Sequence, residues 1–269
     1  MHYVVSILTV LLFSPPVIAA ETAWQQVSPD VSIRLISDGT LSASGTSLMA
    51  LEIDMPESTK TYWRVPGDTG LPLQLDLSGS TGIGSHRMHW PFPSRETANG
   101  YLDYVYFGHT VLPFEVAVDD ASGGLVVVAD MGICSDICIP ARVDLSLPLV
   151  DSAPDRANGL RIRQALAEVP IAWTEGSEPI GQVSLVSGEE AIAVEIGSTQ
   201  VDVESLIVAA AYGGPLFGVP QKSPQPGLVL LPIAGKSDNS ALDGLEVELT
   251  FMTESGAYLV RRTIGAGGR

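Results

Sequence analysis

Short runs in which apolar and polar residues alternate dominate the first half of the chain. They lie at positions 31–36, 50–55, 71–77, 114–118, 125–129 and 141–147. A period of two residues is typical of strands that bury one face. Gly, Pro, Ser and Asp separate the runs, and helical periodicity is nearly absent. This many short strands with turn signals between them predicts an antiparallel β-sandwich.

The pattern changes near residue 150. Residues 152–155 have the features of a helix start, with an early proline and an acidic residue at the third position. One amphipathic helix is predicted over 155–168, ending before Pro170. Strand-like runs then resume at 182–186, 191–196, 205–211, 228–232, 245–251 and 258–263. They predict a second, smaller β-domain, which contains no cysteine or histidine and is expected to be a structural or partner-binding module.

The amino terminus has the pattern of an export signal. The apolar run at 4–13 is too short to span a bilayer. Ala19 and Ala20 follow it and precede polar residues, as at a signal-peptide cleavage site; a buried N-terminal strand is the alternative. The expected division of the chain is a signal peptide at 1–20, a first β-domain at 21–150, a linker helix at 151–170 and the second β-domain at 171–269.

Composition narrows the classes of partner. The formal net charge of −17 disfavours nucleic acid and anionic lipid as partners. No Gly-x-Ser-x-Gly motif is present, so hydrolase chemistry has little support. Export also changes the chemistry open to cysteine, because disulfides persist outside the cytosol.

The chain contains two cysteines, Cys134 and Cys138, in one apolar segment. Four steps along an ideal strand would separate their Cα atoms by roughly 13 Å, whereas a disulfide needs them within about 7 Å. A bonded pair therefore requires a turn at Ser135 and Asp136, two residue types that favour turns. Strand-like runs flank the pair, so the simplest prediction is a hairpin with the cysteines at its neck.

The spacing leaves the role of the pair open between a structural staple and a redox centre. Closing a ring of about five residues stabilises the folded state by only about 2 kcal/mol on the chain-entropy model. A tight, exposed disulfide is more easily reduced than one that ties distant segments together. The small stabilisation argues against a staple without excluding it.

Four short motifs, in order along the chain, resemble a known family. They are a tryptophan followed by Pro-Gly-Asp-x-Gly at 63–70, Trp-Pro-x-Pro-x-Arg at 90–95, Gly-Tyr at 100–101 and Cys-x3-Cys-Ile-Pro at 134–140. Together they are similar to the N-terminal periplasmic domain of DsbD-type thiol:disulfide interchange proteins, especially the ScsB-like branch. Their aromatic, proline and glycine content also predicts ordered loops that present rings.

The resemblance implies an immunoglobulin-like sandwich with a redox-active cysteine pair near one sheet edge. It implies that Cys138 bonds the partner and Cys134 resolves the mixed disulfide. Aromatic residues of a capping loop would shield the pair, and the matching positions suggest Phe92, Tyr101 and Tyr104. No cofactor or metal is implied, and the activity would be that of a protein-disulfide reductase.

The implied partners are a membrane-embedded thiol reductase and periplasmic thioredoxin-like or disulfide-carrying proteins. Full-length members of the family continue into a membrane domain and a thioredoxin-like domain, which this sequence does not include. We therefore expect a periplasmic protein that receives electrons from a separate membrane protein, or a module that has lost this circuit and kept the fold.

Two rival functions remain open from the sequence. His86 and His89 have the spacing of metal ligands, and with the two cysteines they could form a zinc site, or with Met88 a copper(I) site. The other rival is a non-enzymatic β-sandwich adaptor with a structural disulfide. The first predicts metal bound to the reduced protein, and the second predicts a low reduction potential.

Overall fold

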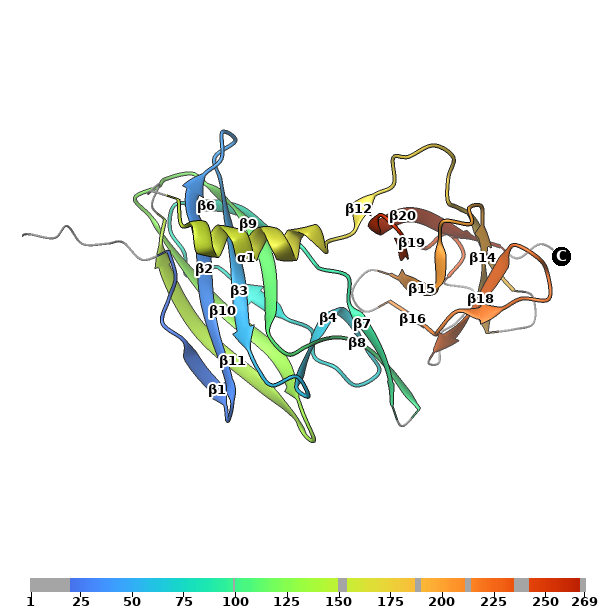
Figure 1. Cartoon of the computed structure of the whole chain (residues 1–269), viewed down its shortest axis with the longest axis horizontal. Coiled ribbons are helices and arrows are strands. Elements are labelled where there is room, and N and C mark those ends of the chain that lie inside the picture. Colours follow the sequence, from blue (N-terminus) through green and yellow to red (C-terminus); the bar gives the residue numbers. More distant parts are fainter. Residues whose placement is uncertain are drawn as a thin grey trace, which may run out of the picture.

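The computed structural model describes residues 20–98, 100–149, 154–186, 190–210, 214–234 and 242–266. In these residues, one helix lies between two β-regions (Figure 1). No helix in the described ranges is long and apolar enough to cross a membrane. Of the predicted signal peptide, only Ala20 lies inside the described residues.

The first β-region consists of two facing antiparallel sheets. The strands of one, in spatial order, are β1 (Gln25–Ser28), β2 (Val31–Leu41), β3 (Thr46–Asp54), β9 (Thr110–Val118) and β6 (Ile83–Met88). The other has the order β11 (Cys138–Pro148), β10 (Gly124–Cys134), β4 (Lys60–Gly67), β8 (Tyr101–Phe107) and β7 (Ser94–Ala98), and β5 (Gln74–Asp76) also pairs with β10. The inward side chains of both sheets form one core. This confirms the predicted immunoglobulin-like sandwich.

The motifs predicted to form ring-presenting loops are loop at residues 68–70 and 90–93, but residues 63–67 lie in a strand, so the prediction was wrong for Trp63. Residues 60–67 form β4, and Tyr62 and Trp63 are both buried although their side chains point to opposite faces. Trp63 enters the sandwich core, whereas Tyr62 is covered by the loop at 68–72. A strand covered on both faces shows no alternation, which explains why its sequence did not look like a strand.

Helix α1 (Arg156–Ala167) agrees with the predicted helix. The Asp155 carboxylate caps its first turn by accepting hydrogen bonds from the backbone N–H groups of Ala157 and Asn158, both at 3.0 Å. Ile162 of the helix packs against Ile36 and Ala50 of the first sheet. The helix therefore covers the outer face of that sheet.

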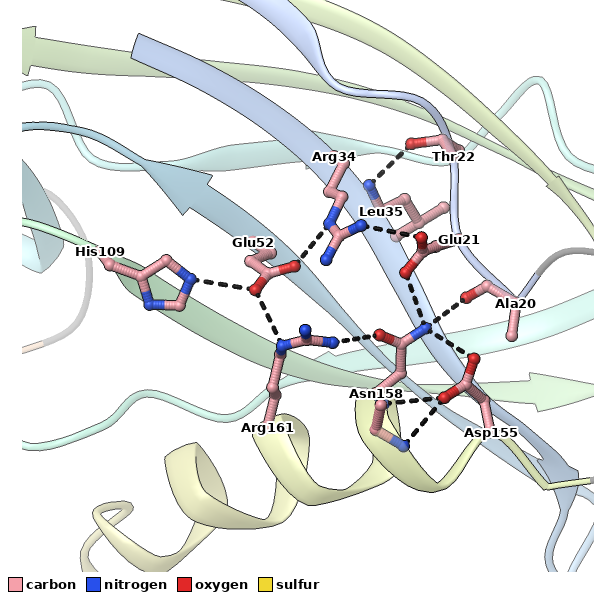
Figure 2. Close-up of polar contacts among 11 residues, drawn as sticks. Ala20, Glu21, Thr22, Arg34, Leu35, Glu52, His109, Asp155, Asn158 and Arg161 are labelled. Carbon is pink, nitrogen blue, oxygen red and sulfur yellow. Dashed lines mark hydrogen bonds and ion pairs between the residues drawn. The ribbon is translucent and has the colours of Figure 1, made fainter. Parts of the chain in front are cut away.

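A buried carboxylate fastens the helix to the sheet (Figure 2). Glu52 on β3 is bonded to Arg34 Nε at 2.6 Å and to Arg161 Nε of the helix at 3.4 Å. His109 Nε2 lies 3.0 Å from Glu52 Oε1, the same oxygen that Arg161 contacts. Glu21 bonds Arg34 at 2.9 Å, so two acids share this guanidinium.

The strands of the second β-region form a closed sheet. Its strands are β12 (Ile171–Ala172), β13 (Ile180–Leu185), β14 (Ala191–Ile196), β15 (Asp202–Ala209), β16 (Leu216–Phe217), β17 (Gln221–Lys222), β18 (Leu228–Ala234), β19 (Glu246–Thr253) and β20 (Gly256–Gly265). The sheet order is β12-β20-β13-β14-β18-β16-β15-β19, and β19 returns to pair with β20. Two pairings, β12–β20 and β13–β20, are parallel, and the rest are antiparallel. This region has a core of its own.

The two β-regions also touch each other. The Arg95 guanidinium donates to the carbonyl oxygens of Glu204 and Leu206 on β15, at 2.5 Å each. Arg64 on β4 bonds Glu248 of β19 at 2.6 Å. The second β-region is therefore held against the sheet that carries the cysteines.

Candidate redox site

Cys134 and Cys138 form a disulfide at the neck of the β10–β11 hairpin. Cys134 is the last residue of β10 and stands directly opposite Cys138, the first residue of β11. Their Cα atoms are 4.0 Å apart, and the three residues between them turn the chain. The predicted hairpin is thus confirmed, and its tip projects from the lower end of the sandwich in Figure 1.

The two sulfurs differ in access. Cys134 is only 1% exposed, whereas Cys138 lies in an exposed run from Ser135 to Pro140. Ile137 beside it is 75% exposed, and Ile139 is also an exposed apolar residue. An incoming thiolate can therefore reach Cys138, while Cys134 is shielded by the protein.

Tyr62 provides the contact that buries the inner sulfur. Its hydroxyl oxygen lies 2.8 Å from Cys134 Sγ and 3.5 Å from Cys138 Sγ. Tyr62 is fully buried and forms a small cluster with Val105 and Cys134, apart from the main core. A phenol is therefore held directly against the redox-capable bond.

Two glycines allow the Tyr62 ring to fit. A Cβ atom at Gly70 would lie 2.1 Å from the ring, and one at Gly132 would lie 3.1 Å from it. The Gly132 N–H donates to the Leu71 carbonyl at 3.0 Å, so the loop at 68–72 is fastened to β10. Close approach of backbone to ring is the physical reason for glycine at both positions.

Asp103 anchors the same loop. Its carboxylate accepts hydrogen bonds from the Thr69 backbone N–H at 3.0 Å and from the Thr69 hydroxyl at 2.6 Å. Asp103 is itself buried on β8. The cover over Tyr62 is therefore held by hydrogen bonds to the sheet as well as by packing.

Lys60 is the cation nearest the pair in the strand ladder, because it stands opposite Cys134. It is bonded to Glu96, and its ammonium lies 3.5 Å from an Asp103 oxygen. Burial opposes its charged form, but the hydrogen bond to Glu96 and the electrostatic interactions with Tyr62, Glu96 and Asp103 outweigh it and raise the pKa of Lys60. Its positive charge is thus retained and is compensated by two carboxylates.

The three predicted shielding residues lie in different surroundings. Tyr101 is 55% exposed at the tip of the β7–β8 hairpin, and Phe92 is half-buried against the main core. Tyr104 is buried edge-on against Trp63, on the face of β8 opposite Val105. The hydrogen-bond contacts to sulfur found in the described residues come from Tyr62. Shielding by the three predicted residues stays a prediction.

The histidine pair lies apart from the cysteines in the fold. His86 is exposed on β6 of the first sheet, and His89, just after it, lies 3.4 Å from Glu115. The cysteines belong to the opposite sheet. Within the described ranges, no group of three or more His, Cys, Asp and Glu residues could hold a metal ion.

Comparisons with known proteins agree with this geometry. Residues 35–149 match the family described as "Thiol:disulfide interchange protein DsbD, N-terminal". The fold is similar to the N-terminal periplasmic domain of ScsB from Proteus mirabilis, with a TM-score of 0.73 and 22% identity over 93% of this chain and 100% of that one.

A match to titin Ig tandem domains has 10% identity over 86% of this chain and 91% of that one, and its TM-score of 0.20 is too low to bear on the fold. No curated protein matches the sequence. The matched residues include both cysteines and every strand of the two sheets except β1 and the start of β2, so residues 35–149 resemble the N-terminal domain of DsbD-type thiol:disulfide interchange proteins.

Proposed function

We propose that the protein is a periplasmic thiol–disulfide exchange module, which relays electrons between a membrane reductase and periplasmic redox partners through Cys134 and Cys138. The observation that carries the proposal is the asymmetric disulfide. Cys138 is an exposed residue at a hairpin tip, and Cys134 is buried beneath it. A family of thiol:disulfide interchange proteins supplies the chemical context.

The exchange proceeds in two steps. A thiolate of a reduced partner attacks Cys138 Sγ, the Cys134–Cys138 bond breaks, and its electron pair remains on Cys134. A second partner thiolate then attacks the partner sulfur of the mixed disulfide and releases Cys138. The partner leaves oxidised, and the hairpin holds two thiols. In the reverse direction, the Cys138 thiolate attacks a disulfide of the next partner, and Cys134 resolves the product.

The surface around Cys138 favours a protein partner. Ile137, Ile139 and Leu71 are exposed apolar side chains on the hairpin and on the neighbouring loop. Such a surface is expected to bind a membrane-embedded thiol reductase on one side of the relay and a thioredoxin-like or disulfide-carrying protein on the other. Its activity would be that of a protein-disulfide reductase.

The proposal includes the cellular location of the protein and the boundaries of its domains. The ScsB domain of similar fold is periplasmic, which supports export by a signal peptide at residues 1–20. The separate cores support a first domain at 21–150 and a second at 171–269, joined by the helix. The contacts of Arg64 and Arg95 with the second region suggest that the domains act together.

The reduction potential of the Cys134–Cys138 pair tests the proposal. It can be measured on the purified protein by thiol trapping in a graded redox buffer, with a variant in which serine replaces both cysteines as the blank. Exchange proteins have potentials of roughly −180 to −270 mV. A potential below about −300 mV would identify a structural bond and favour the adaptor function instead.

A further inference from the structure

We propose that Tyr62 is a catalytic residue of the exchange reaction. Its hydroxyl stabilises Cys134 as the leaving thiolate when a partner thiolate attacks Cys138, and it thereby selects which sulfur of the disulfide is attacked. This inference rests on the proposed exchange function. It assigns a role to a side chain that lies outside the four motifs and is not one of the three predicted shielding residues.

The geometry fixes the hydroxyl at the sulfur that must leave. Its oxygen is 2.8 Å from Cys134 Sγ, compared with 3.5 Å from Cys138 Sγ. The close approaches of Gly70 and Gly132 leave the ring no room to turn aside. The donor is therefore already in position before any charge develops on the sulfur.

The chemistry of the contact favours a role in the reaction over a role in packing. A hydroxyl that is buried away from water needs a good hydrogen-bond acceptor. Among the described residues, the hydrogen-bond partners of this hydroxyl are the two sulfurs. Disulfide sulfur is a weak acceptor, but a thiolate is an anion, and hydrogen bonds to ions are about twice as strong as neutral ones. The contact therefore becomes strong only when the disulfide opens.

The two cations nearest the disulfide, in the strand ladder and in sequence, are bonded to carboxylates, so stabilisation of the Cys134 thiolate falls to Tyr62. Lys60 stands opposite Cys134, but its ammonium is engaged with Glu96 and Asp103. Arg142, four residues beyond the pair, is bonded to Asp130 at 2.8 Å. Within the described part of the chain, the hydrogen-bond donor found at Cys134 Sγ is the Tyr62 hydroxyl.

The reaction step is balanced without another reagent. The attacking partner sulfur forms a bond to Cys138 Sγ, and the bond between the two cysteine sulfurs breaks. The electron pair of that bond goes to Cys134 Sγ, which accepts the hydrogen bond of the Tyr62 hydroxyl while the phenol keeps its proton. A leaving thiol with a lower pKa leaves faster, and hydrogen bonding to the thiolate lowers that pKa. Attack at Cys138 is therefore favoured over attack at Cys134.

Tyr62→Phe tests the inference, because it removes the hydroxyl and keeps the ring. With dithiothreitol as the attacking dithiol, reduction of the disulfide should be about tenfold slower, equivalent to 1.36 kcal/mol in the barrier. Tyr106→Phe is the matched control. It removes a buried hydroxyl that donates to the Pro91 carbonyl at 2.7 Å, and the rate should be unchanged. Thermal unfolding of both variants shows whether either has lost stability.

A second measurement reports on the thiolate itself. In a Cys138→Ser background, the pKa of the Cys134 thiol can be obtained from the ultraviolet absorbance of the thiolate. Adding Tyr62→Phe should raise that pKa by about one unit, because the charged form loses its hydrogen bond. If Tyr62→Phe does not fold, a fluorinated tyrosine at position 62 keeps the ring and donates more strongly, and disulfide reduction should then be faster.

The outcomes separate this inference from the proposed function. A wild-type potential in the range of exchange proteins, with equal rates and equal thiol pKa values for wild type and Tyr62→Phe, would overturn the role of Tyr62 and leave the exchange function standing. A structural potential in the wild type would overturn both. A slower Tyr62→Phe variant with an unchanged Cys134 pKa would indicate altered access to the sulfur, and it too would refute leaving-group stabilisation.

Discussion

Replacing Glu52 with alanine should loosen helix α1 from the sandwich and lower the stability of the protein. The Glu52 side chain is 3% exposed and is shared by Arg34, Arg161 and His109. Arg34 lies on the same sheet, whereas Arg161 comes from the helix, so one carboxylate joins the two layers (Figure 2). Its removal leaves these groups without their common partner.

The expected loss of stability depends on how well water can hydrate each partner of Glu52 once the carboxylate is removed. Arg161 and His109 have side chains that are 39% and 51% exposed, so both can be rehydrated. Arg34 is 10% exposed, and among the described residues it keeps the Glu21 carboxylate at 2.9 Å and the Trp24 ring, whose centroid lies 4.5 Å from its Cζ. Breaking a buried ion pair costs about 3–5 kcal/mol, and the remaining Glu21 contact places this case near the lower end, at about 3 kcal/mol. For a chain of this size, that corresponds to a fall in Tm of about 6–12 °C.

Thermal and urea unfolding of Glu52→Ala, followed by circular dichroism, measure this loss. Arg87→Ala provides the control, because its 2.8 Å contact with Glu115 is on the surface and the Arg87 side chain is 72% exposed. Its loss should be under about 1 kcal/mol. The double variant Arg34→Met with Glu52→Leu removes both buried charges together and should recover at least half of the lost stability.

Two results would refute the reasoning. If Glu52→Ala unfolds within about 1 kcal/mol of the wild type, the carboxylate does not hold a desolvated partner. If the double variant is no more stable than the single one, the loss comes from packing around the helix and not from an unpaired Arg34. The first result would mean that the apolar contacts of Ile162 are enough to dock the helix.

Two further changes test other parts of the structure. Gly70→Ala would place a methyl group 2.1 Å from the Tyr62 ring, so it should destabilise the protein by about 1–3 kcal/mol and speed alkylation of the reduced cysteines, whereas Gly124→Ala, in open space, should do neither. The pKa of Glu115 is lowered from 4.5, because its bonds to Arg87 and His89 outweigh the opposing effect of burial. The stability it contributes is therefore present above pH 4.5 and is lost as the pH falls through the lowered pKa, so Glu115→Gln should reduce Tm at neutral pH and match the wild type in acid. A Tm difference that grows on acidification would contradict this sign.

Local sequence pattern was sufficient to identify the strands that bury one face in the sandwich core. The alternating runs became β2, β3, β9, β10 and β11, because their polar positions do point away from the core. The helix start was predicted to within a few residues, but the pattern placed Asp155 in the first turn, whereas Asp155 is the N-cap. The run at 71–77 was the exception, since only Gln74–Asp76 pairs as a strand. Pro72 cannot donate a ladder hydrogen bond, which shortens the strand from its beginning.

Pattern failed where a second layer covers the polar face. The alternation at 50–55 placed Glu52 on the side expected to face water, but helix α1 covers that side and turns an ordinary surface acid into a buried one. The same reason applies to β4, where a loop covers the face that carries Tyr62. The composition of a strand reports that a face is polar or aromatic, but not what later packs over it.

The residues around the disulfide show the same limit of prediction from sequence. The cysteine spacing and the family resemblance predicted Cys134 and Cys138 as the reacting pair and a shielding ring among residues 92–104. The ring that meets the sulfur comes from 72 positions before Cys134. Cys134 pairs with Lys60, and a period of two places Tyr62 on the same face of β4 as Lys60. A contact of this kind depends on strand order, so it could be inferred only after β4 had been placed beside β10.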